Sequence, residues 1–118
     1  AGKSTGVFNG KVFVHRDAQK TNGYQSNNNI LLSDDATMNS KPELEIYADD
    51  VRCSHGSTTG QLDEDAVFYL RARGLDEFGA TALLLTAFAG DVLNAISSES
   101  LRENLEGKIQ SKLKEMRA

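Results

Sequence analysis

The sequence predicts a mainly β N-terminal half followed by an α-helical C-terminal half. Residues 1–60 hold short apolar patches that glycine, asparagine and serine separate, with the alternation of apolar and polar residues that is typical of strands. Residues 61–118 instead repeat apolar residues at spacings of three and four, which is the helical period. We therefore predict two domains, one over residues 1–60 and one over residues 61–118.

Several short strands are expected in the first half, with no helix between them. Residues 6–10 read as a strand end and a turn, and residues 11–16 alternate as a strand does. Residues 21–29 form a polar connection, and their asparagine run suits either the stacked turns of a β-helix or a disordered loop. Residues 43–47 and 51–55 are the next two strands. Many short strands of this kind indicate a sandwich, a barrel or a β-helix.

Three helices are expected in the second half. Asp63 can cap a helix over residues 64–73, and Gly74 stands where a left-handed residue ends it. Asp76 can cap the second helix. The apolar stripe of that helix is Ala80, Leu83, Leu84, Ala87, Phe88 and Val92.

The third helix is amphipathic. Ser97 or Ser98 can start it, and Glu103, three residues after Ser100, suggests a capping box. One apolar stripe, for a core or a partner, is formed by Leu101, Leu105, Ile109, Leu113 and Met116.

Composition narrows the function classes. With 118 residues and a net charge of −4, the chain lacks the basic surface of a general nucleic-acid binder. Its longest apolar-rich stretch, residues 80–89, is too short to span a membrane. The single cysteine cannot form an internal disulfide and fits a reducing compartment, so we expect a cytoplasmic protein.

Cys53 and His55 are the most informative pair of side chains. On a strand, residues two positions apart point to the same face, roughly 6–7 Å apart at the backbone. A thiol and an imidazole placed in this way can bind a soft metal, form an activated thiolate, or lie in a core with Val51. Spacing alone leaves these three alternatives open.

A complete metal site within this chain is not expected. Structural zinc takes four Cys or His ligands and an iron–sulfur cluster usually takes four thiolates, whereas this chain has one cysteine and two histidines. A Cys-His nucleophile would need an oxyanion hole, and no motif around Cys53 provides one. The acidic residues at 49–50 and 63–65 are accounted for by a turn and by a helix N-terminus.

One continuous segment resembles a known family. Residues 41–60 read KPELEIYADDVRCSHGSTTG, residues 61–74 continue with QLDEDAVFYLRARG, and residues 36–42 lead in with ATMNSKP. Order, spacing and identity together resemble the SufB/SufD family of iron–sulfur cluster assembly proteins. The Cys-Ser-His-Gly version, with Ala-Asp-Asp before it, is similar to the SufD branch.

The resemblance implies a fold and two partners. Members have a right-handed parallel β-helix followed by a C-terminal helical domain, so residues 1–60 would be the last coils of the β-helix and residues 61–118 the helical domain. A SufB-like scaffold would bind through the β-helix end. A SufC-like ATPase would bind the C-terminal helices, broadly residues 62–96. No nucleic acid and no membrane is implied.

The resemblance also implies a site. His55 is the first candidate for building the nascent cluster at the subunit interface, and Cys53 is the second. No cofactor is expected to bind this chain tightly, because the cluster is transient and belongs to the full complex. Members are several hundred residues long, so this chain is interpreted as a C-terminal fragment. Its uncovered strand edges predict a homodimer.

Two other functions remain open on the sequence alone. The chain could be a pure interaction module in which Cys53 and His55 are inert. It could also be a β-helical enzyme that uses Cys53 with His55, or the acidic clusters, on a polymer substrate. The assembly-subunit hypothesis predicts no catalysis by this chain.

Overall fold

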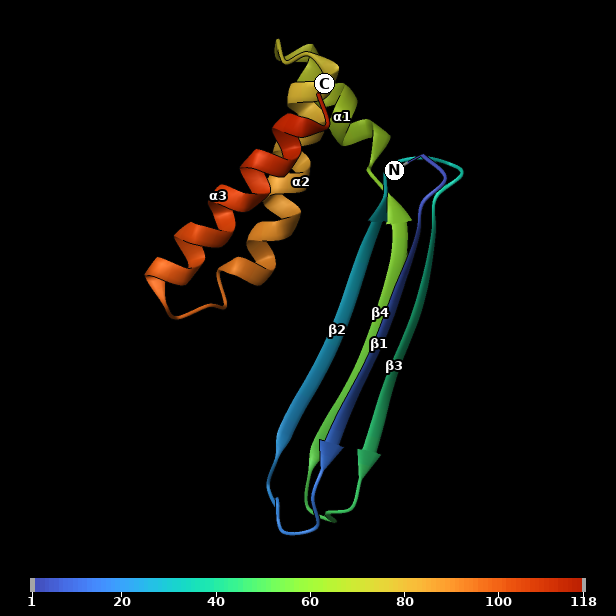
Figure 1. Cartoon of the computed structure of the whole chain (residues 1–118), viewed down its shortest axis with the longest axis vertical. Helices are drawn as coiled ribbons and strands as arrows, with labels where there is room; N and C mark the ends of the chain where they lie inside the picture. The colour runs from blue at the N-terminus through green and yellow to red at the C-terminus, as the bar shows by residue number, and fades with distance from the viewer. Residues whose placement is uncertain (1, 118) are drawn as a thin grey trace. The chain divides into compact units, whose positions relative to one another are not determined.

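The computed structural model describes residues 2–117, in which four strands are followed by three helices (Figure 1). The strands are β1 (Thr5–Val14), β2 (Asn22–Leu31), β3 (Thr37–Ile46) and β4 (Arg52–Gln61). The helices are α1 (Glu64–Ala72), α2 (Glu77–Leu93) and α3 (Glu99–Glu115). The chain separates into two units, a β unit that ends at Gln61 and a helical unit that begins at Leu62.

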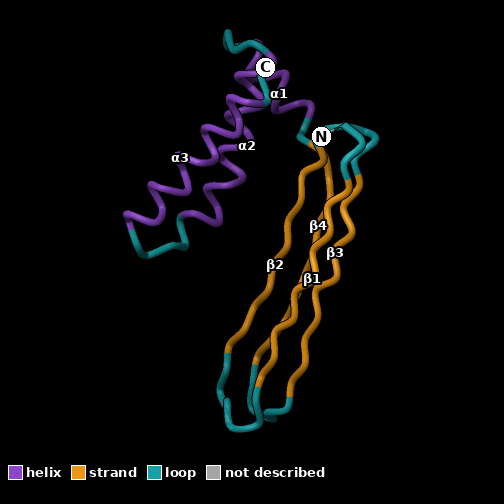
Figure 2. The backbone as a smooth tube through the Cα atoms, viewed as in Figure 1, coloured by secondary structure: helices purple, strands orange, loops and turns teal. Residues whose placement is uncertain are grey.

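The β unit consists of two parallel strand pairs. β1 pairs with β3, starting with Thr5 beside Thr37, and β2 pairs with β4, starting with Asn22 beside Arg52. Successive strands therefore alternate between the pairs, and Figure 2 shows the loops that join them at both ends of the unit. Each parallel pair needs a long crossover, and here a strand of the other pair provides it.

Two segments that the sequence analysis assigned to turns or connections are strands. Residues 6–10 continue β1 without a break, and nearly all of residues 21–29 belongs to β2. Burial alternates along β2, with Gly23, Gln25 and Asn27 partly covered and their neighbours exposed. The strand period is present in this segment, but glycine and polar side chains carry it, so a hydropathy pattern does not reveal it.

Hydrogen-bonded side chains join the two strand pairs. Ser40 Oγ on β3 donates to Asn27 Oδ1 on β2 over 2.7 Å. Ser57 Oγ on β4 donates to Ser40 Oγ over 2.9 Å, and Asn29 Nδ2 donates to Asn27 Oδ1 over 2.7 Å. The asparagine run therefore belongs to a hydrogen-bonded strand, and the alternative of a disordered loop is wrong.

Local capping sets the first two helices, as predicted. Asp63 accepts a hydrogen bond from the backbone N–H of Asp65 over 2.9 Å and caps α1. Gly74, with φ of +102°, follows the end of α1 in the region that favours glycine. Asp76 accepts from the N–H of Gly79 over 2.7 Å and caps α2.

The third helix begins at the serine pair but without the predicted capping box. Ser98 is the N-cap, and its Oγ accepts from the N–H of Leu101 over 3.4 Å. Ser100 therefore lies inside the helix, and the third helical position holds Leu101 in place of Glu103. The box is wrong because two serines compete for the cap and the earlier one takes it.

The predicted apolar stripes of α2 and α3 are only partly buried. Ala80 and Leu113 are buried, whereas Leu83, Val92 and Leu101 are 49%, 71% and 49% exposed. The helical unit thus keeps exposed apolar side chains on both long helices. No helix within residues 2–117 is both long and apolar enough to cross a bilayer.

Candidate functional site

Cys53 and His55 face the same side of β4, as their spacing predicts. Ser57, two residues further along, reaches Ser40 on the other strand pair, so the odd-numbered residues of β4 lie on the inner face of the unit. Gly23, which pairs with Cys53, agrees with this placement, because a Cβ there would lie 3.5 Å from the Cys53 sulfur.

The two side chains differ in exposure. Cys53 is a half-buried free thiol, whereas His55 and the rest of residues 54–61 are exposed. In the described part of the chain, β4 pairs only with β2, so its other edge is open. The imidazole therefore lies at an uncovered edge of the β unit, where a second molecule can reach it.

The site offers half of a ligand set for a metal centre. Within residues 2–117, no three His, Cys, Asp or Glu side chains come together as a metal site. Cys53 can supply one thiolate sulfur and His55 one imidazole nitrogen, and iron–sulfur clusters accept both kinds of ligand. Further ligands would have to come from another chain or from a small molecule.

The acidic residues at the start of α1 have a structural role. Asp63 caps α1, and Glu64 and Asp65 lie in its first turn, where the helix dipole favours negative charge. The backbone N–H of Asp50 donates to Gln19 Oε1 over 2.9 Å and so ties two loops of the β unit together. An enzyme that uses these acids gains no support from their positions.

Gln25 was not predicted to belong to the site, but the register places it beside His55. The two residues are partners across the β2–β4 ladder. Among the described residues, Gln25 Oε1 is buried and accepts no hydrogen bond. No sequence pattern signals this pairing, because the register of strands separated by another strand is a tertiary property.

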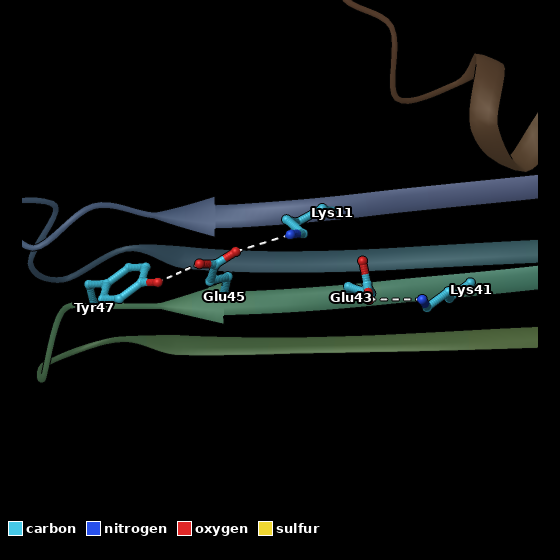
Figure 3. A network of polar contacts seen from close by, with 5 residues as sticks. All are labelled: Lys11, Lys41, Glu43, Glu45 and Tyr47. Carbon is cyan, nitrogen blue, oxygen red and sulfur yellow. Dashed lines mark hydrogen bonds and ion pairs between the residues drawn. The ribbon is translucent and has the colours of Figure 1, made fainter.

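Sequence reasoning also missed a charged network on β1 and β3 (Figure 3). Lys11 Nζ lies 3.1 Å from Glu45 Oε2, and the Tyr47 hydroxyl donates to Glu45 Oε1. These hydrogen bonds, first from Tyr47 and then from Lys11, lower the pKa of Glu45. The same carboxylate raises the pKa of Tyr47 and of Lys11. Lys41 and Glu43 form a second ion pair at 3.4 Å.

An aromatic cluster adjoins this network. The ring of Phe13 lies 5.1 Å from that of Tyr47 and 4.6 Å from that of His15, between centroids. Together with Arg16 these rings line a shallow hollow. His15 lies within the strand predicted over residues 11–16, and it is exposed just beyond the end of β1. The signal for the cluster was the alternation of aromatic and charged residues at the ends of both strands.

The helical unit also has a hollow, which lies around Phe68, a side chain that is 74% exposed. Its lining combines apolar and charged side chains of α1, α2 and their connection. These are Phe68, Arg71, Ala72, Leu75, Asp76 and Glu77. The hollow lies within residues 62–96, the segment for which an ATPase contact was expected.

The family comparison covers most of the chain. Residues 1–88 match the family model described as SUF system FeS cluster assembly, SufBD core domain. This range contains all four described strands, α1 and most of α2. Cys53, His55 and Gln25 thus all lie inside the matched segment.

Curated relatives agree with this match. The iron–sulfur cluster assembly SufBD family protein slr0076 of Synechocystis is 54% identical over 99 residues, which are 84% of this chain and 22% of that protein. The iron–sulfur cluster assembly protein SufD of Escherichia coli is 42% identical over 111 residues, or 94% and 26%. Protein ABCI7, chloroplastic, of Arabidopsis thaliana is 40% identical over 107 residues, or 91% and 22%. The chain spans about a quarter of the length of these relatives. It belongs to the SufBD family of iron–sulfur cluster assembly proteins.

Proposed function

We propose that this chain is part of a SufD-like subunit that assists iron–sulfur cluster assembly without catalysis of its own. One observation carries the proposal: Cys53 and His55 lie side by side on the inner face of the open edge strand β4. Both are ligands that iron–sulfur centres accept, and both lie within the segment that matches the family.

The β unit is proposed to be the end of a right-handed parallel β-helix. The alternation of strands between two parallel pairs supports this, since β1 with β2 and β3 with β4 would form two successive coils. Residues 1–60 are then the last coils and residues 61–118 the helical domain. A SufB-like scaffold would meet the open edges of the last coil.

His55 is the proposed contact for the nascent cluster, and Cys53 is the second candidate. The exposure of His55 supports this order, because a half-buried thiol is less accessible to a cluster that an adjoining subunit shares. The cluster is the cargo of the assembly reaction, so it would be held transiently while the partner supplies the remaining ligands. The chain itself would retain no cofactor.

The helices are the proposed docking surface for a SufC-like ATPase. Exposed Phe68, Leu83 and Val92 support this role, since large apolar side chains left in water often mark interaction sites. The protein would work in the cytoplasm, where a free thiol stays reduced. Produced alone, the chain would form a homodimer in place of the contact with a SufB-like protein.

The test is a chimera in which this chain replaces the matching region of Escherichia coli SufD, to which it is 42% identical. It is expressed in a strain that lacks its own SufD and depends on this pathway for clusters. We expect His55→Ala to lower the activity of a reporter iron–sulfur enzyme about tenfold or more, as loss of a cluster contact should. His15→Ala, the same change at the other histidine, is the matched control and should leave the activity unchanged.

A pure interaction module is the second candidate, and the exposed apolar side chains of α1 and α2 favour it. In the chimera it differs from the first proposal only at His55, because both candidates use the apolar side chains of the helices. His55→Ala would be silent, while Leu83→Asp, at a position that is 49% exposed, would abolish the reporter activity. Circular dichroism of the variant chain must show unchanged helix content for that result to count.

A further inference from the structure

The residue paired with His55, Gln25, carries a buried amide oxygen that has no hydrogen-bond partner within residues 2–117. Gln25 and His55 are paired in the β2–β4 register, and paired residues of parallel strands project to the same face. Gln25 Oε1 is buried and accepts no hydrogen bond within the described residues. Such an oxygen is costly to leave unsatisfied, so a native role for it is expected.

Gly10 on β1 makes room for this amide. A Cβ at that position would lie 2.5 Å from Gln25 Nε2 and 2.6 Å from Phe8 Cζ, which is closer than real side chains approach. Gly10 does not have a positive φ, so the site uses its missing side chain rather than its backbone freedom. The amide nitrogen of Gln25 therefore lies against Gly10. His55, which is paired with Gln25 across the ladder, can supply an N–H donor.

We propose that Gln25 is a positioning residue for His55. The structure does not contain the hydrogen bond that we infer: one imidazole N–H of His55 would turn to donate to Gln25 Oε1, which has no other donor among the described residues. That bond would select one neutral tautomer and leave the other ring nitrogen free to contact iron. Ligating histidines almost always donate through their second nitrogen to an oxygen of this kind. The inference rests on the proposed function, in which His55 contacts the nascent cluster, and Gln25 acts only through His55.

The contact can be tested on the chain itself by nitrogen-15 NMR. The chain has two histidines, so His15→Gln leaves His55 as the single imidazole, and its ring nitrogen shifts report the ratio of neutral tautomers. Loss of an ordinary hydrogen bond in Gln25→Leu should change this ratio about fivefold. Gln25→Glu keeps an acceptor oxygen and should preserve the wild-type tautomer. Backbone amide dispersion checks that each variant is folded.

Two glycines provide a steric control. Gly10→Ala places a methyl group where the amide lies and should shift the tautomer ratio in the same direction as Gln25→Leu. Gly23→Ala meets the Cys53 sulfur at 3.5 Å, an ordinary contact, and should leave the ratio unchanged. A ratio that stays the same in folded Gln25→Leu overturns the inference.

The chimera separates this inference from the proposed function. Gln25→Leu should lower reporter activity about tenfold, and Gln25→Glu should recover most of it. If His55→Ala lowers the reporter activity but the tautomer ratio of His55 is unchanged in the Gln25 variants, the positioning role fails and the proposed function stands. If the tautomer ratio responds but His55→Ala is silent, the hydrogen bond is supported and the proposed function fails.

Discussion

The thiol and the imidazole on β4 differ because their neighbours differ. Cys53 lies beside Gly23 on the paired strand, and there it is partly covered. His55 lies beside Gln25 and near the uncovered end of the inner face, so it stays accessible. Two residues on one face of one strand therefore differ in what they can do: the Cys53 thiol is partly packed, and the His55 imidazole is available to another molecule.

Tyr47→Phe should make stability less dependent on the ionisation of Glu45. The pKa of Glu45 is lowered in the folded state, so its contribution is present above its ordinary value near 4.5 and is lost as pH falls through the lowered value. The pKa of Tyr47 is raised, so its contribution is present below its ordinary value near 10.0 and is lost as pH rises beyond it.

The urea midpoint of wild type should therefore exceed that of Tyr47→Phe between about pH 5 and pH 10, and the two should converge on either side. Tyr24→Phe is the control, since Tyr24 is a 70% exposed tyrosine on β2. A gap between wild type and Tyr47→Phe that is the same at every pH would contradict the assigned network.

At the scale of elements, helix starts depend on single capping side chains. Asp76→Ala removes the acceptor for the Gly79 N–H and should lower the free energy of unfolding by about 1 kcal/mol, measured by urea denaturation followed by circular dichroism. Asp76→Asn keeps the cap but removes the ion pair with Arg117, which spans 3.6 Å at the surface and contributes little. Equal losses in the free energy of unfolding of the two variants would show that the charge of Asp76, and not its capping hydrogen bond, stabilises the helix.

Elements could be predicted from the sequence where the residues that determine them are close together in the chain. Asp63, Gly74 and Asp76 act within one helical turn, and the structure confirms the predicted role of each. β2 was missed because its inner face carries amides such as Gln25 and Asn27, whose hydrogen-bond partners lie on other strands. A pattern based on hydropathy cannot detect a strand whose inner face is polar.

The open edges of β3 and β4 are not equivalent. The backbone N–H of Thr37 in β3 donates to Ser4, just before β1, and that of Tyr47, just after β3, donates to Val14 in β1. Because successive residues of a strand turn their N–H groups to opposite sides, the residue at position 42 faces the open edge. That position holds Pro42, which has no N–H to offer an added strand. In β4 the Arg52 N–H points to the β2 side, so residues such as Thr59 present free-edge N–H groups. Of these two edges, an added strand should therefore prefer that of β4.

At the scale of the whole molecule, this preference predicts how the chain associates. Thr59→Pro removes one open-edge donor while leaving the β2–β4 ladder intact, and should convert the expected dimer to a monomer in sedimentation equilibrium well above micromolar concentration. Thr59→Ala keeps the donor and should remain dimeric. A wild-type chain that is monomeric under these conditions would contradict the predicted homodimer.

The candidate site was predictable in part. The shared face of Cys53 and His55 follows from the two-residue period of a strand, and the structure confirms it. The family follows from a long ungapped motif, and the comparisons confirm that too. Gln25 could not be found, because it lies 30 positions from His55 and only the register of the ladder brings them together. The roles of His55 and Cys53 toward a cluster stay predictions.

The small buried core of the β unit also has a thermal consequence. Of the side chains that the structure describes in this unit, the buried apolar ones are Val14, Ala36 and Ala48. Most other apolar side chains of the unit are only half-buried, so unfolding should expose less new hydrocarbon than in a protein with a large core. Hydrocarbon exposure is what gives unfolding a large positive heat capacity. The stability curve of the β unit should therefore have little curvature, so that cooling weakens this unit less than it weakens a protein with a large apolar core. Its order relies mainly on the backbone ladders of the two strand pairs.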